Sequence, residues 1–428
     1  MKWGKRQLGD LAEIQSGFGF PREEQGRTDQ DIPFYKVGDM NLPGNETEMQ
    51  VRANTVSRET LKSLGGRAFP AGTTIFPKIG AAIATEKKRI LVEEATYDNN
   101  VMGLIPRAGV EGRFLFYWSR SFRLMSVANI GPVPSIRKSE MERVDVPYFP
   151  HSEQRRIVEL LDQADALRKQ RAEADQLADR ILPALFLKLF GDPTSLAGRD
   201  GARPLASWGI EVQNGFACGD KDVSDGLPHM RMNNIDDHGR LNLDLIRTVP
   251  RDYADEKYEL RGGDVLFMGT NSEEKVGKCC VFSQPDHRRW YYSNHLARLR
   301  NSEMHSTPEF LAVYLHQLWR AGFYRSRMKR WVNQAAMNAD AIRAIPLSPV
   351  NIELAKDFSS KYWTLNTMHE RRISAEATIK MQFEVMLQRA LTGDLTAKWR
   401  EAHMKELLQE MEQQARYLRQ SAGERIET

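Results

Sequence analysis

Two long stretches of the chain show the spacing of apolar residues that is typical of a helix packed against another helix. Residues 152–190 contain no glycine and a single proline, and their apolar positions recur at steps of three and four. These positions are Ile157, Leu160, Ala164, Leu167, Ala174, Ala178, Ile181 and Leu185. A second stretch, from about residue 353 to residue 391, has a similar stripe at Phe358, Leu365, Met368, Ile379 and Met386.

The first of these helices has recognisable ends. Ser152, followed by Glu153-Gln154, suits a helix start, Pro183 predicts a kink and Gly191 predicts the end. A helix of about 39 residues would be roughly 58 Å long, which exceeds what a globular domain needs. We therefore expect the two helices to pair in antiparallel fashion. The alternative is that each packs only on its own domain.

The segments before each long helix have the character of short strands. Alternating runs such as Thr74-Ile75-Phe76 are separated by glycine and proline, which favours strands joined by turns. One helical stretch interrupts them near residues 111–128 and again near residues 308–329.

Several marks return in the same order about 200 residues later. Gln15-Ser16-Gly17-Phe18 returns as Gln213-Asn214-Gly215-Phe216, and Tyr97-Asp98-Asn99-Asn100 returns as Tyr292-Ser293-Asn294-His295. This interval is far longer than a solenoid repeat, so it indicates two duplicated domains.

The predicted fold class is α+β, with two similar mixed α/β domains related by pseudo-twofold symmetry and separated by two long antiparallel helices that form a coiled-coil spacer. The expected boundaries are a first recognition domain, a spacer helix, a second recognition domain, a second spacer helix and an amphipathic helical tail. They fall at residues 1–151, 152–191, 192–351, 352–396 and 397–428.

The composition indicates the cellular compartment of the protein. The 61 basic and 57 acidic residues leave a net charge of +4, and no run approaches the roughly 18 apolar residues of a membrane span. The first 15 residues have no apolar stretch, so we expect no secretory signal, and the three cysteines are an odd number that includes the adjacent pair Cys279-Cys280. These features favour a cytoplasmic protein that does not associate with a membrane.

Catalytic motifs are missing from the sequence. Gly17-Phe18-Gly19 lacks a third glycine, and Gly277-Lys278 lacks the remainder of a phosphate loop. No CxxC or HExxH spacing occurs, so we expect no metal site and no catalytic residues in this chain. The pattern favours a binding protein over an enzyme.

Basic segments with interleaved aromatic residues are the strongest sign of a ligand. Residues 320–331 carry five cations around Phe323, Tyr324 and Trp331, and residues 287–292 are similar. Lysine and arginine neutralise phosphates, while Arg, Asn and Gln can contact base edges. The alternative is an ordinary solvated helix face, with the polar residues acting as turn or capping residues.

The candidate DNA-binding residues combine these cations with nearby polar loop residues in both copies. They are Lys36, Lys78, Asn99, Asn100, Arg120, Arg123, Ser135, Arg137, Lys138, Arg231, Asn233, Thr270, Asn271, Arg288, Arg289, Asn294, His295, Arg325, Arg327, Lys329, Arg330, Asn333, Gln334 and Asn338.

Three stretches resemble the DNA-specificity subunit of type I restriction–modification systems. Residues 144–150, VDVPYFP, lead into residues 152–157, SEQRRI, as in that family's proline-rich run before an EQ-x-x-I helix start. Residues 185–193 resemble the end of its central conserved helix, and residues 390–396 with Trp399-Arg400 resemble its C-terminal conserved region. The second helix departs from the pattern, because residues 349–353 lack the EQ pair.

The resemblance implies a division of labour. Two target-recognition domains would each read one part of a split DNA sequence, held apart by the paired helices. The chain would bind no cofactor itself. It would bind double-stranded DNA and two modification subunits, which carry S-adenosylmethionine and methylate adenine at N6. Whether motor and nuclease subunits join for restriction stays open.

Two other classes of function also stay open on the sequence alone. One is a stand-alone architectural DNA-binding protein without a methyltransferase partner, and the other is an uncharacterised DNA-acting enzyme. The tail has an apolar stripe at Met404, Leu407, Leu408, Met411, Ala415 and Leu418. This stripe would either pack on the paired helices or bind a separate partner.

Overall fold

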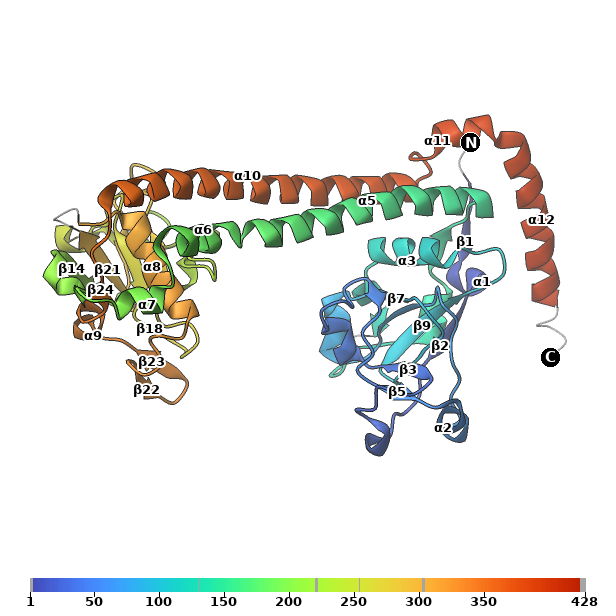
Figure 1. Cartoon of the computed structure of the whole chain (residues 1–428). Helices are drawn as coiled ribbons and strands as arrows, with labels where there is room; N and C mark the ends of the chain where they lie inside the picture. The colour runs from blue at the N-terminus through green and yellow to red at the C-terminus, as the bar shows by residue number, and fades with distance from the viewer. Residues whose placement is uncertain (1–2, 130, 220–221, 254, 302–304, 424–428) are drawn as a thin grey trace. The chain divides into compact units, whose positions relative to one another are not determined.

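The structure, a computed structural model, describes residues 3–129, 131–219, 222–253, 255–301 and 305–423, with side chains described up to residue 416. It divides into two compact units. Unit 1 comprises Met1–Gln170 and Glu376–Thr428, and unit 2 comprises Arg171–Ala375. Each unit contains one strand-rich domain and parts of both long helices, which confirms the α+β class (Figure 1).

Unit 1 is built around a five-stranded sheet that is covered by helix α3, Gly112–Ser121. The strand order is β2 (Ala12–Ser16), β9 (Val101–Pro106), β6 (Thr74–Pro77), β7 (Arg89–Leu91) and β4 (Glu48–Met49). A second sheet has the order β5 (Thr55–Val56), β3 (Ile32–Tyr35) and β8 (Thr96–Tyr97). Two small pairs join β1 (Lys5–Gln7) to β12 (Asp145–Pro147) and β10 (Ala128–Asn129) to β11 (Ser135–Ile136). The short helices are α1 (Leu8–Leu11), α2 (Arg58–Ser63) and α4 (Lys138–Glu142).

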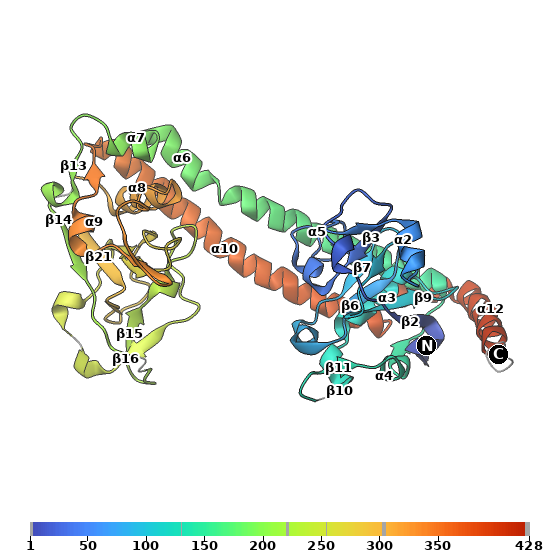
Figure 2. The ribbon, with the colours of Figure 1, turned by 90° about the horizontal axis from the view of Figure 1, so that it is seen from below.

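Unit 2 repeats this plan around a four-stranded sheet that is covered by α8, Pro308–Arg320 (Figure 2). The strand order is β14 (Ile210–Asn214), β21 (Leu296–Asn301), β17 (Val265–Met268) and β19 (Cys279–Val281). Three-stranded sheets have the orders β16 (Arg247–Val249), β15 (Leu227–Met230), β20 (Tyr291–Tyr292), and β18 (Thr270–Asn271), β23 (Gln334–Ala336), β22 (Lys329–Trp331). The remaining pair joins β13 (Arg203–Pro204) to β24 (Pro346–Leu347), and the short helices are α7 (Pro193–Ala197) and α9 (Ala339–Arg343).

The two copies share the same hydrogen bond at equivalent positions. In unit 1 the Tyr97 hydroxyl donates to the carbonyl oxygen of Gln15 at 3.2 Å, and in unit 2 the Tyr292 hydroxyl donates to that of Gln213 at 3.2 Å. Two residues after each glutamine comes a glycine, Gly17 or Gly215. A Cβ on either glycine would overlap the carbonyl oxygen of the tyrosine in the same copy. The repeated QxGF pattern is therefore explained by a close approach of two backbone segments that leaves no room for a side chain.

The cores of both units include the long helices. In unit 1, Ile157 and Leu161 of the first helix and Leu387 of the second lie in the same buried cluster as the residues of α3. In unit 2, Phe186 and Phe358 lie with residues of α8 in a second cluster. The helices thus pack on the domains as well as on each other, so the two arrangements expected from the sequence occur together.

The first long helix is interrupted near its end, where the sequence predicts a kink at Pro183. Helix α5 spans His151–Ala178 and α6 spans Ile181–Phe190, with the break at Asp179 and Arg180. Pro183 is the third residue of α6 and has no N–H for the carbonyl of Asp179 four residues earlier. The proline therefore ends the helix one turn before its own position.

The second long helix, α10, is continuous over Ile352–Leu391 and lies antiparallel to α5 within each unit. In unit 1, the ring of Phe383 lies under the guanidinium groups of Arg168 and Arg120, at 4.5 and 4.8 Å. In unit 2, Arg372 donates to the Asp179 carboxylate and to the carbonyl oxygen of Asp175, both at 2.9 Å. Later positions of α5 thus meet earlier positions of α10, as predicted for an antiparallel pair.

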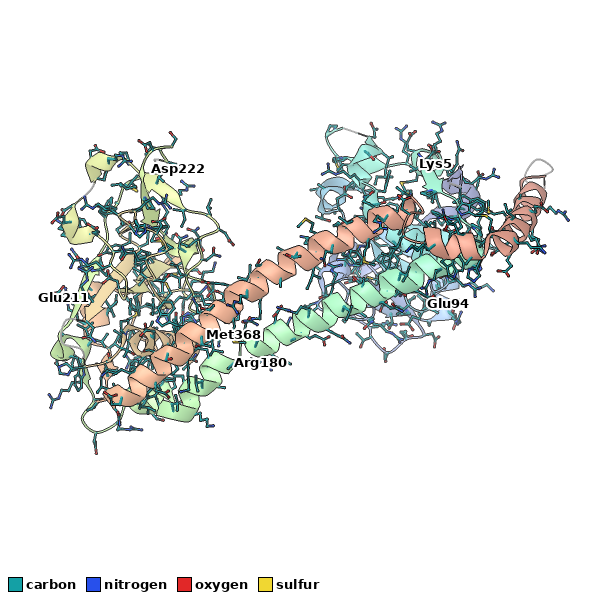
Figure 3. All side chains as sticks on the ribbon, turned by 90° about the horizontal axis from the view of Figure 1, so that it is seen from above. Lys5, Glu94, Arg180, Glu211, Asp222 and Met368 are labelled. Carbon is teal, nitrogen blue, oxygen red and sulfur yellow. The ribbon has the colours of Figure 1, made fainter. Side chains whose placement is uncertain are left out.

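The predicted apolar stripe is only partly the contact surface. Ile157, Ala178 and Phe358 are buried or half-buried, but Leu167 is 66% exposed and Met368 is 54% exposed. Met368 and Arg180, both labelled in Figure 3, are exposed. Charged residues take the inward positions instead, which is why the middle of the pair is held by ion pairs and cation–π contacts.

Asp179, at the break, is a centre of these contacts. Its carboxylate accepts hydrogen bonds from Arg372 and from Arg240 at 3.0 Å. Burial acts to raise the pKa of Asp179, but the bonds from both arginines outweigh it and lower the pKa below the ordinary value. The carboxylate is therefore held ionised where the helix is interrupted.

Both residues of the EQ pair at the start of α5 are buried and fully engaged. Glu153 is 0% exposed and accepts from Arg400 Nη2 at 2.7 Å, from Thr396 Oγ1 at 2.6 Å and from Trp3 Nε1 at 2.5 Å. Gln154 donates to the carbonyl oxygen of Phe149 at 2.8 Å and accepts from the Glu111 amide at 2.8 Å. The pair holds the helix start to the domain and to the C-terminal segment.

The start of α10 uses different chemistry. The side-chain oxygen of Asn351 accepts from the amides of Glu353 and Leu354, at 3.0 and 3.2 Å. This is ordinary N-capping by asparagine, so the missing EQ pair is replaced by a local cap.

The tail forms α11 (Ala397–Ala402) and α12 (Met404–Gly423). Within unit 1, Glu410 accepts from the amide of Ser152 at 3.0 Å, and Gln414 donates to the carbonyl oxygen of Gly109 at 3.2 Å. Leu407 is buried, whereas Leu408 stays 42% exposed. The tail thus packs beside the start of α5 and the loop before α3, and the side chain of Leu418 lies outside the described residues.

The glycine positions give a stability test. Gly17→Ala or Gly215→Ala should each destabilise its unit by about 2 kcal/mol or more, because a Cβ would be forced into a backbone carbonyl. Gly19→Ala and Gly262→Ala are matched controls, since a Cβ at Gly19 has no neighbour within 4 Å and one at Gly262 makes only ordinary contacts. Urea denaturation would measure the difference, and equal midpoints for test and control variants would contradict the close approach.

The ion pair of Glu153 gives a second test. Arg400→Met should cost about 3–5 kcal/mol, because it leaves a buried carboxylate without its cation. The double variant Glu153→Gln/Arg400→Met should cost less than the single variant, since no charge is then left unpaired. Urea unfolding of the three proteins would show this order, and a single variant costing under about 1 kcal/mol would refute it.

Candidate nucleic-acid interface

One edge of the unit 1 domain gathers several of the predicted residues around the turn between β8 and β9. Lys78, which follows β6, donates from its Nζ to Ser16 Oγ at 2.8 Å and from its amide to the carbonyl oxygen of Asn100 at 2.9 Å. The amide of Ile136, next to Ser135, in turn donates to the Lys78 carbonyl oxygen at 2.9 Å. Strand ends and a turn thus bring Lys78, Asn100 and Ser135 together.

Lys36 joins the same edge from the end of β3. Its Nζ donates to Gln25 Oε1 at 3.0 Å, and the carbonyl oxygen of the preceding residue, Tyr35, accepts from the amide of Asp98 at 3.0 Å. Burial raises the pKa of Asp98, while the amide of Asn100 donates to its carboxylate at 2.9 Å. The bonds of Asp98 therefore fix the conformation of the turn, and Asn99 and Asn100 remain exposed.

Arg137 and Lys138 lie directly after β11. Arg137 is the N-cap residue of α4, and Lys138 lies 3.9 Å from Glu142 across one turn of that helix. Both side chains are exposed, so they extend the cationic edge outward from Ser135.

Arg120 and Arg123 lie elsewhere. Arg120, in α3, is 3.6 Å from Asp165 of α5 and stacks on Phe383 of α10. Both arginines line a hollow with Lys88 and Arg168. Arg120 thus has a structural role between α3 and the long helices, and the structure does not bring it to the edge at Lys78.

Unit 2 builds an equivalent edge around the turn between β20 and β21. The carbonyl oxygen of His295 accepts from the amides of Gly269 and Thr270, at 2.8 and 3.1 Å, and the amide of Asn294 donates to the carbonyl oxygen of Phe216 at 3.1 Å. Asn271 lies next to Thr270 in β18, and this strand pairs with β23. The turn, β18 and β23 therefore form one surface.

Arg231 occupies the position in unit 2 that Lys36 has in unit 1. The amide of Arg231 donates to Asn234 Oδ1 at 2.8 Å, as that of Lys36 does to Asp39 Oδ2 at 2.7 Å. Arg231 also donates to the carbonyl oxygen of Gly219 at 3.2 Å. Asn233 is exposed and donates to the carbonyl oxygen of Leu245 at 3.2 Å.

The basic run of unit 2 is not helical beyond Arg320, which corrects the expected helix over residues 308–329. Gly322 has a φ of 74°, a conformation that ends α8, and the chain continues through turns into β22. The helix expected over residues 111–128 likewise ends at Ser121. The run is therefore no solvated helix face, because most of its cations lie on turns and on a hairpin strand.

The cations of this run differ in their surroundings. The Arg327 guanidinium stacks on the ring of Phe323 at 3.8 Å, and Arg330 donates to both carboxylate oxygens of Glu273, at 2.9 and 2.8 Å. Arg325 and Lys329 are exposed. Arg330 thus fixes the hairpin to the preceding loop, while the others present charge.

The polar residues of the hairpin region also divide into two kinds. Asn333 forms the turn between β22 and β23 with a φ of 62°, and Gln334 is exposed at the start of β23. Asn338 accepts from the amide of Ala341 at 2.9 Å as the N-cap of α9. The capping alternative therefore holds for Asn338.

Arg288 and Arg289 lie before β20, whereas the edge turn follows it. Arg288 lies 2.7 Å from Asp286, and hydrogen bonds led by that from Arg288 lower the pKa of Asp286 to about 2. Arg289 lies 2.8 Å from Glu259. These two cations are paired locally and are not part of the edge.

The sequence prediction missed the apolar residues of the edge. Val332, at the hairpin turn, is 90% exposed, and Val133, in the corresponding hairpin of unit 1, is 61% exposed. A valine within a turn rich in Gly, Pro or Asn, flanked by cations, is the signal that could have found them.

The described residues contain neither a cluster of metal ligands nor a helix that could span a membrane. Among the described residues, no group of three or more His, Cys, Asp and Glu side chains is arranged to hold a metal ion. Within the same part of the chain, every helix is too short or too polar to cross a membrane.

Comparison with known proteins gives a consistent family. The family described as the type I restriction modification DNA specificity domain matches residues 1–175. The specificity subunit of the type I restriction enzyme EcoKI from Escherichia coli K12 is 22% identical over 312 residues, which cover 66% of this chain and 64% of the relative. That of StySPI from Salmonella potsdam is 21% identical over 303 residues, covering 67% and 64%. The chain thus spans just under two thirds of the length of these relatives.

Solved structures share the fold. The S subunit of the type I restriction–modification system from M. genitalium matches with a TM-score of 0.53 and 12% identity, covering 91% of this chain and 96% of the other. A chain from a study of assembly and conformational transition of a type I system matches with a TM-score of 0.54 and 16% identity, covering 92% and 98%. The resemblance predicted from the sequence is therefore confirmed: residues 1–175 match the family described as the type I restriction modification DNA specificity domain.

Proposed function

We propose that this chain is the DNA-binding specificity subunit of a type I restriction–modification complex and has no catalysis of its own. It reads a bipartite DNA target and directs partner subunits to methylate adenine at N6, or to restrict unmodified DNA. One observation carries this proposal. The same edge, formed by a turn and strand ends with exposed amides and cations, occurs in both units at equivalent positions.

The chemistry of the edges fits DNA. Lys36 and Lys78 in unit 1 and Arg231 and Lys329 in unit 2 can neutralise phosphates, which supplies most of the affinity. Asn99, Asn100, Asn294 and Gln334 carry amides of the kind that pair with adenine edges. Two edges with different side chains on one frame would read two different half-sites.

The proposed boundaries follow from this division. Residues 1–151 and 192–351 are the target-recognition domains, and residues 152–191 and 352–396 contribute the spacer helices. The antiparallel contacts of α5 and α10 in each unit support the proposal that the helices set a fixed spacing between the domains. Half-sites read from one face of B-DNA lie about 34–36 Å apart or at multiples of that distance.

The partners in this proposal are two modification subunits that carry S-adenosylmethionine in the cytoplasm, so this chain binds no cofactor. Exposed apolar residues on the helices support docking there. In unit 1 they are Leu167, Met381 and Val385, and in unit 2 they are Leu177, Ile181, Met368 and Ile373. Apolar side chains exposed in such number on helices are typical of a surface that a partner covers.

Salt dependence tests the DNA edge of unit 2. The triple variant Arg325→Ala/Arg327→Ala/Lys329→Ala should bind duplex DNA more weakly and reduce the slope of log K against log[salt] by about one per lost phosphate contact. The matched control is Lys356→Ala/Lys361→Ala/Arg371→Ala, which removes three exposed cations of α10 in the same unit. Fluorescence anisotropy across a salt series would measure both slopes, and an unchanged slope in the first variant would exclude this edge.

A domain exchange tests the function itself. A chimera that takes residues 1–151 from a related specificity subunit should change one half of the methylated target and leave the other half and the spacer unchanged, because each domain reads alone. Mapping N6-methyladenine in host DNA with and without the gene gives the target and its change. Absence of any gene-dependent methylation would rule out the proposed function, and a change in both halves would rule out independent reading.

A further inference from the structure

The β22–β23 hairpin of unit 2 presents apolar side chains to solvent from a firmly held base. Val332 is 90% exposed and Trp331 is 60% exposed. At the base, Ala335 is 0% exposed and Met328 is 7% exposed within the main core of the unit, and β23 pairs with β18. The tip is thus carried on a two-stranded ribbon whose base lies in the core (Figure 1).

The strand register sorts the side chains of the hairpin onto two faces. Lys329 pairs with Ala336, Arg330 with Ala335 and Trp331 with Gln334. Because side chains alternate along a strand, Lys329, Trp331 and Gln334 share one face, and all three are exposed. Arg330 shares the other face with buried Ala335 and bonds Glu273, which fixes the hairpin to its domain.

The exposed face combines three chemistries that suit one ligand. Lys329, with Arg325 and Arg327 beside it, supplies positive charge, Gln334 supplies an amide, and Trp331 with Val332 supplies apolar surface. A two-stranded ribbon fits the major groove of B-DNA, where thymine alone presents a methyl group. A protein partner would explain the apolar residues but not the concentration of cations around them.

The same position in unit 1 has the same character. Its hairpin joins β10 to β11, and Val133 in the connecting turn is 61% exposed. Ser135, Arg137 and Lys138 follow in the chain, as Gln334 and Asn338 follow the turn in unit 2. An exposed valine at the tip of the equivalent hairpin in both copies indicates a shared use.

We propose that the β22–β23 tip enters the major groove of the second half-site, where Val332 and Trp331 contact thymine methyl groups and so read sequence. This inference rests on the proposed function, since it requires duplex DNA as the ligand. Lys329 and Arg325 hold the flanking phosphates, and Gln334 lies beside the apolar contact to bond a base edge. The tip then contributes specificity as well as affinity.

The experiment uses the full chain, with its modification subunit where the two co-purify, and duplexes that carry the target found by methylation mapping. Val332→Ser and Trp331→Ala should each weaken specific binding by about 10-fold and leave binding to an unrelated duplex unchanged. Both side chains are exposed, so the variants should fold as the parent does. Leu243→Ser is the matched control, because Leu243 is an exposed apolar residue of the same unit, 37% exposed, that lies neither on the hairpin nor on the long helices.

A second probe isolates the methyl group. Replacing the thymines of the second half-site by deoxyuridine should weaken binding by the parent chain, and Val332→Ser should show a much smaller further loss. Equal losses on specific and unrelated duplexes, or no loss in the tip variants, would overturn base reading by the tip. So would loss of the modification subunit instead of DNA, which would make the tip a protein-docking site. A parent chain that binds no DNA would instead refute the proposed function.

Discussion

A single buried carboxylate, that of Glu153, holds together segments that are far apart in the chain. It joins the start of α5 to Arg400 and Thr396 near the end of the chain and to Trp3 near its beginning. The bonds from Arg400 and Thr396 are buried and that from Trp3 is part-buried, so the carboxylate cannot lose its cation without a large cost. Neutralising this one charge therefore ties the start of α5 to the segment that follows α10 and to the beginning of the chain.

The duplicated frame and the varied edge obey different constraints. Gly17 and Gly215 are fixed by a backbone approach that excludes any side chain, and Tyr97 and Tyr292 hold that approach with the same hydrogen bond. The residues on the turns above them have no such restriction. The fold can therefore keep this backbone approach while the exposed side chains of the turns vary.

Much of the fold could be predicted from the sequence, because the spacing of apolar residues and the order of repeated motifs can be recognised without knowledge of contacts. The antiparallel helices, the duplication and the polar turns at Asn99 and Asn294 were found in that way. The buried face of the helix pair could not be predicted in this way. Leu167 and Asp165 fit similar spacings of three and four residues, and only tertiary contacts decide which of them is buried. The exposed tip valine was missed for the same reason, since valine usually predicts burial.

The polar contacts between α5 and α10 have a consequence for the register of the two helices. An all-apolar heptad seam can slip by a whole repeat and still bury its side chains, a shift of about 10.5 Å. Arg372 between Asp175 and Asp179, and Phe383 beneath Arg168, allow one alignment only. Such a seam resists sliding, so within each unit α5 and α10 keep a single register instead of a set of registers that differ by one heptad.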